Sequence, residues 1–264
     1  MTSIAGLTPT VCALMGLDAT VQGMAPAFDA PLAHARNQEI NTVAKALLFA
    51  PDAVGLHLHQ RFPHAFDGVA AMAPVAVDLV AALPSVTPVC FATMFTGLPP
   101  SVHGVQTYAK PVVKAPTLFD HALRAGLSVA IVAVQASSVD LLFRERELDY
   151  FSEPSDPADT ERALALIEGG EHDLIVAYQQ DYDDAVHGTG PFSTEAVEAL
   201  DAHLAAFETL GTAANQSWAR HARLLAFIPD HGAHAEGDGT GSHGLDLPED
   251  LNVRHYFAVA PGTP

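Results

Sequence analysis

Positively charged residues are scarce in this 264-residue sequence. It contains 12 lysines and arginines against 31 aspartates and glutamates, which gives a net charge of −19. Because nucleic acids and anionic membrane surfaces are themselves negative, this balance argues against either as a partner. No apolar run reaches the roughly 20 residues that a membrane-spanning helix needs. The acidic balance is instead compatible with a site that collects metal cations.

Cysteine is also rare, with only Cys12 and Cys90 in the whole chain. Two such distant cysteines provide neither a disulfide framework nor a CxxC metal site. The first 18 residues carry no lysine or arginine, so they lack the positive segment that opens a secretory signal. We therefore expect the reducing cytoplasm as the location of the protein.

Hydrophobic residues, by contrast, make up 49% of the chain, and apolar runs alternate with helical patterns. This alternation predicts an α/β fold with a mostly parallel central sheet and helices on both faces. The predicted strands are 46–51, 75–82, 128–134, 173–178, 224–229 and 256–260, and the predicted helices are 88–96, 118–125, 157–167 and 194–210. Residues 149–160 and 232–250 read as loops. We expect a single domain over residues 1–264.

Polar residues follow four of the predicted strands. Asp52 follows the first strand, Thr87 comes soon after the second, Asp183 follows the fourth, and Asp230 follows the fifth. Ligands of open α/β sheets bind beyond the carboxyl ends of the strands. These four strand ends are therefore the predicted site.

Histidine is abundant, with 14 residues, and two histidines stand close to these aspartates. His231 directly follows Asp230, and the divergent directions of neighbouring side chains would let each face a different cation. His187 lies four residues after Asp183, a spacing that places both on one face of a helical turn, where they can hold one metal ion.

His243, in a glycine-rich loop, could complete the site of Asp183 and His187. The residue pattern leaves alternatives open at this point. Asp181 or Asp184 could replace Asp183, and His234 could replace His243. A solvated acidic loop is the structural alternative for the whole segment.

Thr87 stands at a turn from a strand into a helix. Pro88 suits the first helical position, so Thr87 is predicted to be the N-cap. A plain helix cap is one interpretation. The other is a nucleophile, because the positive end of a helix and a bound metal would both lower the pKa of its hydroxyl.

Residues 85–88 (SVTP) and 96–105 (TGLPPSVHGV) together resemble the nucleophile segment of the alkaline phosphatase superfamily. The resemblance is strongest to the branch of nucleotide pyrophosphatases, type I phosphodiesterases and phosphonoacetate hydrolase. Asp52, the DxxxHxxGP run at 183–191, the DHG tripeptide at 230–232 and His243 match further motifs of this superfamily, in the same order along the chain.

The resemblance implies an alkaline-phosphatase-like fold and two divalent metal ions, usually zinc and in some branches manganese. One metal site would consist of Asp52, Thr87, Asp230 and His231, and the other of Asp183, His187 and His243. It also implies hydrolysis of a phosphodiester, a nucleotide pyrophosphate or a phosphonate through a covalent phospho-threonine at Thr87. The expected partner is a small-molecule phosphate ester or phosphonate, and a homo-oligomer is compatible with the sequence.

The chain departs from the family pattern in three respects. Cys90 stands where nucleotide pyrophosphatases have an asparagine that contacts the phosphate, which speaks against nucleotide diesters. The 95 residues between Thr87 and Asp183 leave little room for a cap domain. Residues 4–16 resemble a segment that normally comes last in the superfamily, so we interpret residues 1–30 as a permuted element that packs beside strand 256–260. An ordinary amphipathic helix over residues 10–17 is the alternative.

Two other functions stay open at the level of the sequence. The first is a phosphomonoesterase of the same superfamily, and the second is a relative that binds a metal or ligand without catalysis. His57, His59 and His64 follow Asp52 and are candidates for the substrate pocket, with exposed loop histidines as the equal alternative.

Overall fold

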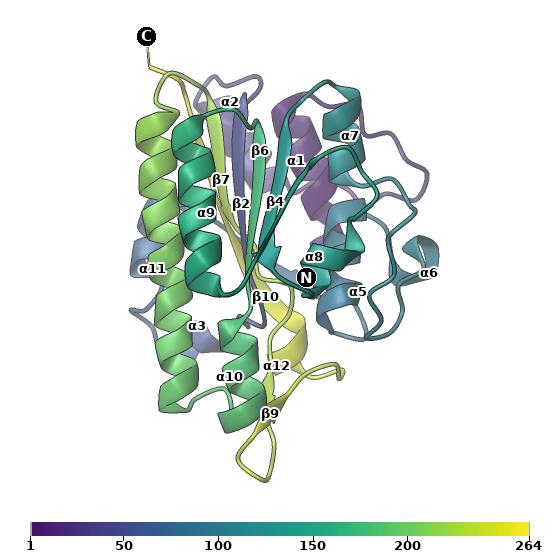
Figure 1. Cartoon of the computed structure of the whole chain (residues 1–264), viewed down its shortest axis with the longest axis vertical. Helices are drawn as coiled ribbons and strands as arrows, with labels where there is room; N and C mark the ends of the chain where they lie inside the picture. Colours follow the sequence, from purple (N-terminus) through teal and green to yellow (C-terminus); the bar gives the residue numbers. More distant parts are fainter. Residues whose placement is uncertain (1, 264) are drawn as a thin grey trace.

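A computed structural model describes residues 2–263, and its centre is one eight-stranded sheet (Figure 1). The strand order is β1-β3-β10-β7-β2-β6-β4-β5. All neighbours run parallel except β10, which is antiparallel to both β3 and β7. The strands are β1 (Thr2–Ser3), β2 (Lys45–Pro51), β3 (Val75–Val80), β4 (Val129–Val134), β5 (Asp149–Glu153), β6 (Leu174–Gln179), β7 (Arg223–Phe227) and β10 (Asn252–Ala260). The predicted mostly parallel α/β fold is confirmed.

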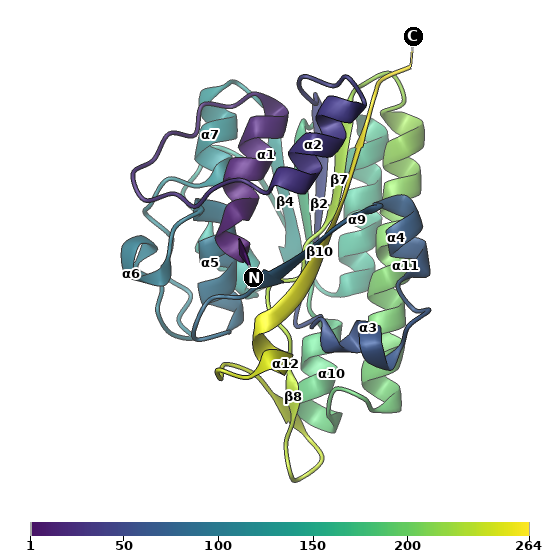
Figure 2. The same cartoon turned by 180° about the vertical axis from the view of Figure 1, so that it is seen from behind.

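Helices cover both faces of this sheet, as Figures 1 and 2 show from opposite sides. One face carries α1 (Leu7–Met15), α2 (Asp29–Asn37), α5 (Thr87–Thr96), α7 (Leu118–Arg124) and α8 (Ser138–Leu142). The other carries α4 (Asp67–Met72), α9 (Asp156–Gly169) and α11 (Thr194–Ser217). Leu48 contributes to the first core and Phe49 to the second, because successive side chains of a strand point to opposite faces.

Shorter elements gather at the carboxyl ends of the parallel strands. They are α3 (His57–Arg61), α6 (Pro100–His103), α10 (Asp181–Thr189), the β8 (His234–Ala235) and β9 (Gly241–Ser242) hairpin, and α12 (Pro248–Leu251). The two segments predicted as loops are therefore partly regular. Residues 149–160 contain β5 and the start of α9, and residues 232–250 contain the hairpin and the start of α12.

Strand β5 and helix α10 were not predicted from the sequence, and each omission has a physical reason. β5 is the edge strand, half-exposed and polar along DYFSE, so it lacks the apolar run of a buried strand. α10 has three aspartates in its first turn and buries only Tyr182, Asp183 and Val186. Its core-facing stripe is too narrow to stand out in the sequence.

The N-terminal segment packs on the face of the sheet that also holds α5. β1 pairs with β3, and α1 packs against α2, α5 and α7. The helix that packs on β10 is α2 rather than α1, and the ring of Phe28 at its start lies 6.0 Å from that of Phe257. Residues 1–30 therefore reach strand 256–260 at Phe28, whereas α1 packs mainly against its neighbouring helices. The permuted chain order itself stays a prediction.

The motif TGLPPSVHG folds into a turn between α5 and α6 and has a structural role. Gly97 and Gly104 end the two helices with φ of 71° and 87°, which a glycine adopts without strain. Val105 donates its backbone N–H to His103 Nδ1, and His103 Nε2 lies 3.0 Å from Thr93 Oγ1 on α5. His103 thus fastens α6 to α5 and does not line the site.

No helix among residues 2–263 combines the length and the apolarity that crossing a membrane requires.

Candidate metal centre

Seven polar side chains meet beyond the carboxyl ends of β2, β3, β6 and β7. They come from positions that are far apart in the sequence but adjacent in the sheet, because parallel strands end at the same edge. The structure sorts them into two clusters. The first cluster contains Asp52, Asp230 and His231 with Thr87 beside them, and the second contains Asp183, His187 and His243.

The first cluster is completely buried. His231 Nε2 lies 3.3 Å from Asp52 Oδ1 and 3.4 Å from Asp230 Oδ2. Thr87 Oγ1 lies 3.5 Å from Asp52 Oδ1 and 3.4 Å from His231 Nε2. Asp230 and His231 therefore serve one cluster, and our inference from the residues alone, that each faces a different cation, is wrong.

The second cluster lies nearer to the surface. His187 Nε2 is 3.4 Å from Asp183 Oδ2 and 3.1 Å from His243 Nε2, and His243 Nε2 is 3.5 Å from Asp183 Oδ1. The His243 ring stacks on the His231 ring with centroids 4.2 Å apart. The two clusters are therefore immediate neighbours.

Backbone carbonyls fix the tautomers of the three histidines. The Nδ1 atoms of His231, His243 and His187 lie 3.0, 2.9 and 3.3 Å from the carbonyl oxygens of Gly232, Ser85 and Gly241. A carbonyl oxygen only accepts, so each Nδ1 carries the proton and donates it. The Nε2 lone pair of each ring then points into its cluster, as in histidines that bind metal ions.

The spacing of these atoms fits tetrahedral metal sites. Two ligand atoms about 2.1 Å from one zinc ion are roughly 3.4 Å apart in a tetrahedron, and the contacts within the clusters range from 3.1 to 3.5 Å. Such separations are long for hydrogen bonds. Asp183 Oδ1 and Asp230 Oδ2 are moreover buried without a hydrogen-bond partner. A cation between these atoms would satisfy them, so the donor set fits two divalent metal ions.

The electrostatics of the first cluster lead to the same conclusion. Burial, together with the nearby charges of Asp230 and Asp183, raises the pKa of Asp52 well above its usual range. Burial likewise raises the pKa of Asp230 to about 8 and lowers that of His231 to about 3. His231 is therefore neutral and available as a ligand, and the crowded carboxylates need a cation to become ionised.

In the second cluster, hydrogen bonding determines the pKa values. Burial alone would raise the pKa of Asp183, but the hydrogen bond with His187 and the charges of the surrounding histidines bring it below the usual value. The same hydrogen bond raises the pKa of His187. One cation, a proton or a metal ion, must lie among these three ligands, since the lone pairs of His187 and His243 would otherwise face each other.

The open alternatives for the second cluster are resolved by the structure. Asp184 is bonded by the side chain of Gln180, and Asp181 faces away toward α9 and α11. His234 is bonded to Asp250 at 2.7 Å and belongs to the β8–β9 hairpin. Neither aspartate nor His234 lies within the cluster.

Thr87 does not cap α5, contrary to the prediction. The N-cap position belongs to Val86, and Thr87 is the first helical residue, with its side chain turned to Asp52 and His231. Thr87 is 2% exposed. The hydroxyl therefore lies at the positive end of a helix and beside three side chains that could hold a metal ion, and it does not act as a cap.

A cavity of about 240 Å³ opens in front of Thr87. Almost all of its lining is polar: Asp52, Thr87, Tyr108, Lys110, Gln135, Ala136, Ser137, Ser138, Tyr178, Gln180, Asp183 and Asp184. Tyr178 also donates its hydroxyl to Asp52 Oδ2 at 2.5 Å and so fixes this carboxylate. The sequence analysis missed Tyr178, Tyr108 and Lys110, because no local motif marks them.

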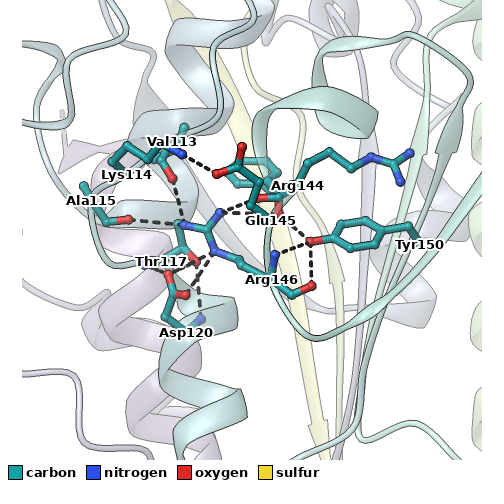
Figure 3. A network of polar contacts seen from close by, with 10 residues as sticks. Val113, Lys114, Ala115, Thr117, Asp120, Arg144, Glu145, Arg146 and Tyr150 are labelled. Carbon is teal, nitrogen blue, oxygen red and sulfur yellow. Dashed lines mark hydrogen bonds and ion pairs between the residues drawn. The ribbon is translucent and has the colours of Figure 1, made fainter.

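The segment that carries Tyr108 and Lys110 is anchored by Arg146 (Figure 3). The Arg146 guanidinium lies 3.1 Å from both oxygens of Asp120 and donates to the carbonyl of Val113 at 2.9 Å. It also reaches the carbonyls of Phe143, Arg144 and Ala115. Arg146 thus ties residues 113–115, which follow the segment of Tyr108 and Lys110, to α7 and to the turn before β5.

Four positions singled out in the sequence lie away from the cavity in front of Thr87. Cys90 is buried with Sγ 3.9 Å from the carbonyl of Ala82 and does not line the cavity. His57 lines a different cavity of about 630 Å³, together with Arg61 and Phe192. His59 stacks on Phe66, and His64 is exposed beside Asp67.

Comparisons with known proteins agree with this geometry. The model of the type I phosphodiesterase/nucleotide pyrophosphatase family matches residues 46–236. Among curated proteins, no sequence matches the chain significantly.

Solved structures show the same fold. Murine ectonucleotide pyrophosphatase/phosphodiesterase 5 aligns with a TM-score of 0.57 and 18% identity over 74% of this chain, and one of its structures is an inactive threonine-to-alanine variant in complex with AMP. Phosphonoacetate hydrolase from Sinorhizobium meliloti 1021, in complex with phosphonoformate, aligns with a TM-score of 0.54 and 16% identity over 75% of this chain. The alignments cover 59% of the length of each of these neighbours.

Proposed function

Because the chain belongs to the type I phosphodiesterase/nucleotide pyrophosphatase family, we propose that it hydrolyses phosphate esters or phosphonates through a covalent phospho-Thr87 intermediate. The observation that carries the proposal is the tetrahedral spacing of two neighbouring clusters, the first of which contacts the Thr87 hydroxyl. The described residues would act as one catalytic domain, since all ligands gather at one edge of the eight-stranded sheet.

Asp52, Thr87, Asp230 and His231 would hold one metal ion, and Asp183, His187 and His243 the other. Two such ions polarise a phosphoryl oxygen and lower the pKa of bound hydroxyls and water. The mixed nitrogen and oxygen donors in tetrahedral spacing favour zinc, and manganese tolerates the same donors.

Thr87 attacks phosphorus in line, and the bond to the leaving group breaks with its electron pair. The proton that Thr87 gives up passes to the leaving group. Water then attacks phosphorus, the bond from phosphorus to Thr87 Oγ1 breaks, and Oγ1 regains a proton from this water as the phosphoryl product departs. Tyr178 keeps Asp52 in place through their hydrogen bond, and the positive end of α5 favours the developing alkoxide on Thr87. Because Thr87 is buried against the clusters, competing water has little access to it.

The cavity favours a small, hydrophilic substrate over a nucleotide. Its roughly 240 Å³ provide room for a phosphoryl group with a short leaving group, and its polar lining lacks an apolar slot for a base. Cys90 supplies no amide to the phosphate, and Lys110 adds a positive charge at the rim. These features support a small phosphonate or a small phosphodiester.

The ligands of the structural neighbours support this class. Phosphonoformate is a small phosphonate with a carboxylate, whereas AMP, as a nucleotide, supports only the broader class of phosphate esters. The buried free thiols of Cys12 and Cys90 suit the reducing cytoplasm, which is our proposed location. A homo-oligomer is compatible with this function, which needs no second subunit.

Turnover of bis-p-nitrophenyl phosphate, p-nitrophenyl phosphate and a small phosphonate, each with zinc or manganese, tests the proposal. Preference for the diester or the phosphonate supports it, and preference for the monoester indicates a phosphomonoesterase. If none of the three substrates is turned over while both metal ions bind, the chain is a binding protein instead.

A further inference from the structure

Asp156, outside the metal centre, makes an unusual set of contacts with α10. It stands in the first turn of α9 and is 4% exposed. Its Oδ1 accepts the backbone N–H of Gln180 at 3.1 Å, and its Oδ2 accepts those of Gln180 and Asp181 at 3.0 and 2.8 Å. A carboxylate of one helix thus binds the N–H groups at the start of another.

His203 of α11 completes this arrangement. Its Nε2 lies 2.8 Å from Asp156 Oδ2, and the ring is fully buried. Gln179, the last residue of β6, donates its side-chain amide to the backbone carbonyl of Asp156 at 3.0 Å. α11 and the start of α10 therefore contact the carboxylate of Asp156, and the end of β6 contacts its backbone carbonyl.

α10 depends on this carboxylate because it provides no cap of its own. Its N-cap residue Gln180 makes no side-chain cap bond, so the first N–H groups need an acceptor from elsewhere. Two residues beyond Asp181 comes Asp183, and one turn later comes His187. The rotation and axial position of the start of α10 therefore determine where both ligands lie.

We infer that Asp156, oriented by His203, is a positioning residue that holds α10 so that Asp183 and His187 converge with His243 on the second metal ion. The inference rests on the proposed function. Asp156 touches neither the clusters nor the cavity in front of Thr87, so it acts only through α10. Removal of groups that orient metal ligands typically weakens metal affinity about 10- to 100-fold.

Zinc titration against a chelating dye, in variants that keep one cluster, tests the inference directly. In an Asp52→Ala background, which keeps the second cluster, Asp156→Ala should weaken zinc binding about 10- to 100-fold. In an Asp183→Ala background, which keeps the first cluster, the same change should alter the zinc affinity less than about threefold. A general loss of structure would weaken both sites alike.

Two further variants keep the test decisive if Asp156→Ala does not fold. His203→Gln retains a donor to Asp156 and should bind zinc like the parent chain, whereas His203→Leu should weaken the second site. Asp173→Ala is the control, because Asp173 also accepts a backbone N–H, that of Ser128 at 3.0 Å, and pairs with a side chain, that of Lys45 at 3.0 Å, but at the opposite edge of the sheet.

Unchanged zinc affinity of the second cluster in both Asp156→Ala and His203→Leu would overturn the inference. Equal weakening of both clusters would also overturn it, since the role would then be structural. If the parent chain itself binds no zinc or manganese at either cluster, the proposed function fails first, and that outcome is distinct from both others.

Discussion

Replacement of Thr87 by alanine separates the nucleophile from the structure around it. The hydroxyl lies 3.5 Å from Asp52 Oδ1 and 3.4 Å from His231 Nε2, and it makes no cap bond to α5. The substitution therefore removes the attacking oxygen and one ligand of the first cluster, and it leaves the backbone of α5 unaltered.

The expected loss of stability is small. Without a cap bond, the helix loses none of the ~1 kcal/mol that an N-cap contributes. The remaining effect is one buried methyl group, worth about 0.8 kcal/mol. For a chain of this size, that corresponds to a fall in Tm of roughly 2–4 °C.

The expected loss of activity is large, because the first chemical step has no nucleophile. A fall in kcat of at least about 10⁴ corresponds to roughly 5.4 kcal/mol of lost transition-state stabilisation. Thr87→Ser keeps a hydroxyl on a less restricted side chain and should retain measurable turnover. The parent chain, Thr87→Ala and Thr87→Ser are compared by their initial rates with bis-p-nitrophenyl phosphate in the presence of zinc.

Thr93→Ala is the matched control on the same helix. Thr93 is also buried, and its hydroxyl donates to the carbonyl of Val89 at 2.8 Å, away from the cavity. It should lose more stability than Thr87→Ala, because the change also removes the contact of Thr93 Oγ1 with His103 Nε2 at 3.0 Å, but it should keep turnover within a few-fold. Turnover of Thr87→Ala at the rate of Thr93→Ala would refute the covalent mechanism.

Three further outcomes follow from contacts elsewhere in the chain. Arg146→Ala should lower the free energy of unfolding by about 3 kcal/mol in urea titrations, since it leaves several carbonyls and a carboxylate without their donor. The control Lys114→Ala removes only an exposed ion pair and should lower the free energy of unfolding by about 0–1 kcal/mol. Burial raises the pKa of Asp159 to about 9, so the folded state keeps a proton that the unfolded chain loses above about pH 4. The free energy of unfolding should therefore fall as the pH rises from 4 to 9. Asp159→Asn should match the stability of the parent at pH 4 and exceed it by up to about 4 kcal/mol at pH 7. Equal stability of the two proteins at pH 7 would contradict this reasoning. Chelation of zinc should lower the Tm, because each site at 100 times its Kd contributes about 2.7 kcal/mol, and a Tm indifferent to zinc would argue against both metal sites.

Buried apolar runs made most of the sheet predictable. The run ALLFAP occupies β2, whose seven residues are all buried, and Asp52 comes directly after it. Strands were not predicted where their burial is partial, as in β5. The first residues of a strand were missed where they are mostly polar, as at Asn252–His255 of β10.

The grouping of the site was harder to predict than its members. The order of strands decides which ends meet, and the sequence does not contain that order in any local pattern. The residue types alone therefore led to the wrong prediction that Asp230 and His231 face different cations, whereas both belong to the first cluster. Arg146 and Asp156 gave no signal at all, because their partners lie on other elements, up to 33 residues away for Arg146.

The helix that carries Thr87 has a consequence for how the enzyme could change. All ten residues of α5 are buried, so most larger side chains there would have to displace packed neighbours and could shift the hydroxyl of Thr87. The facing wall is different, since Tyr108 is 61% exposed and sits in an irregular segment held mainly at its far end by Arg146. New substrate preferences are therefore most accessible through residues 106–110, and a library confined to them would vary the specificity of the protein while its chemistry stays fixed.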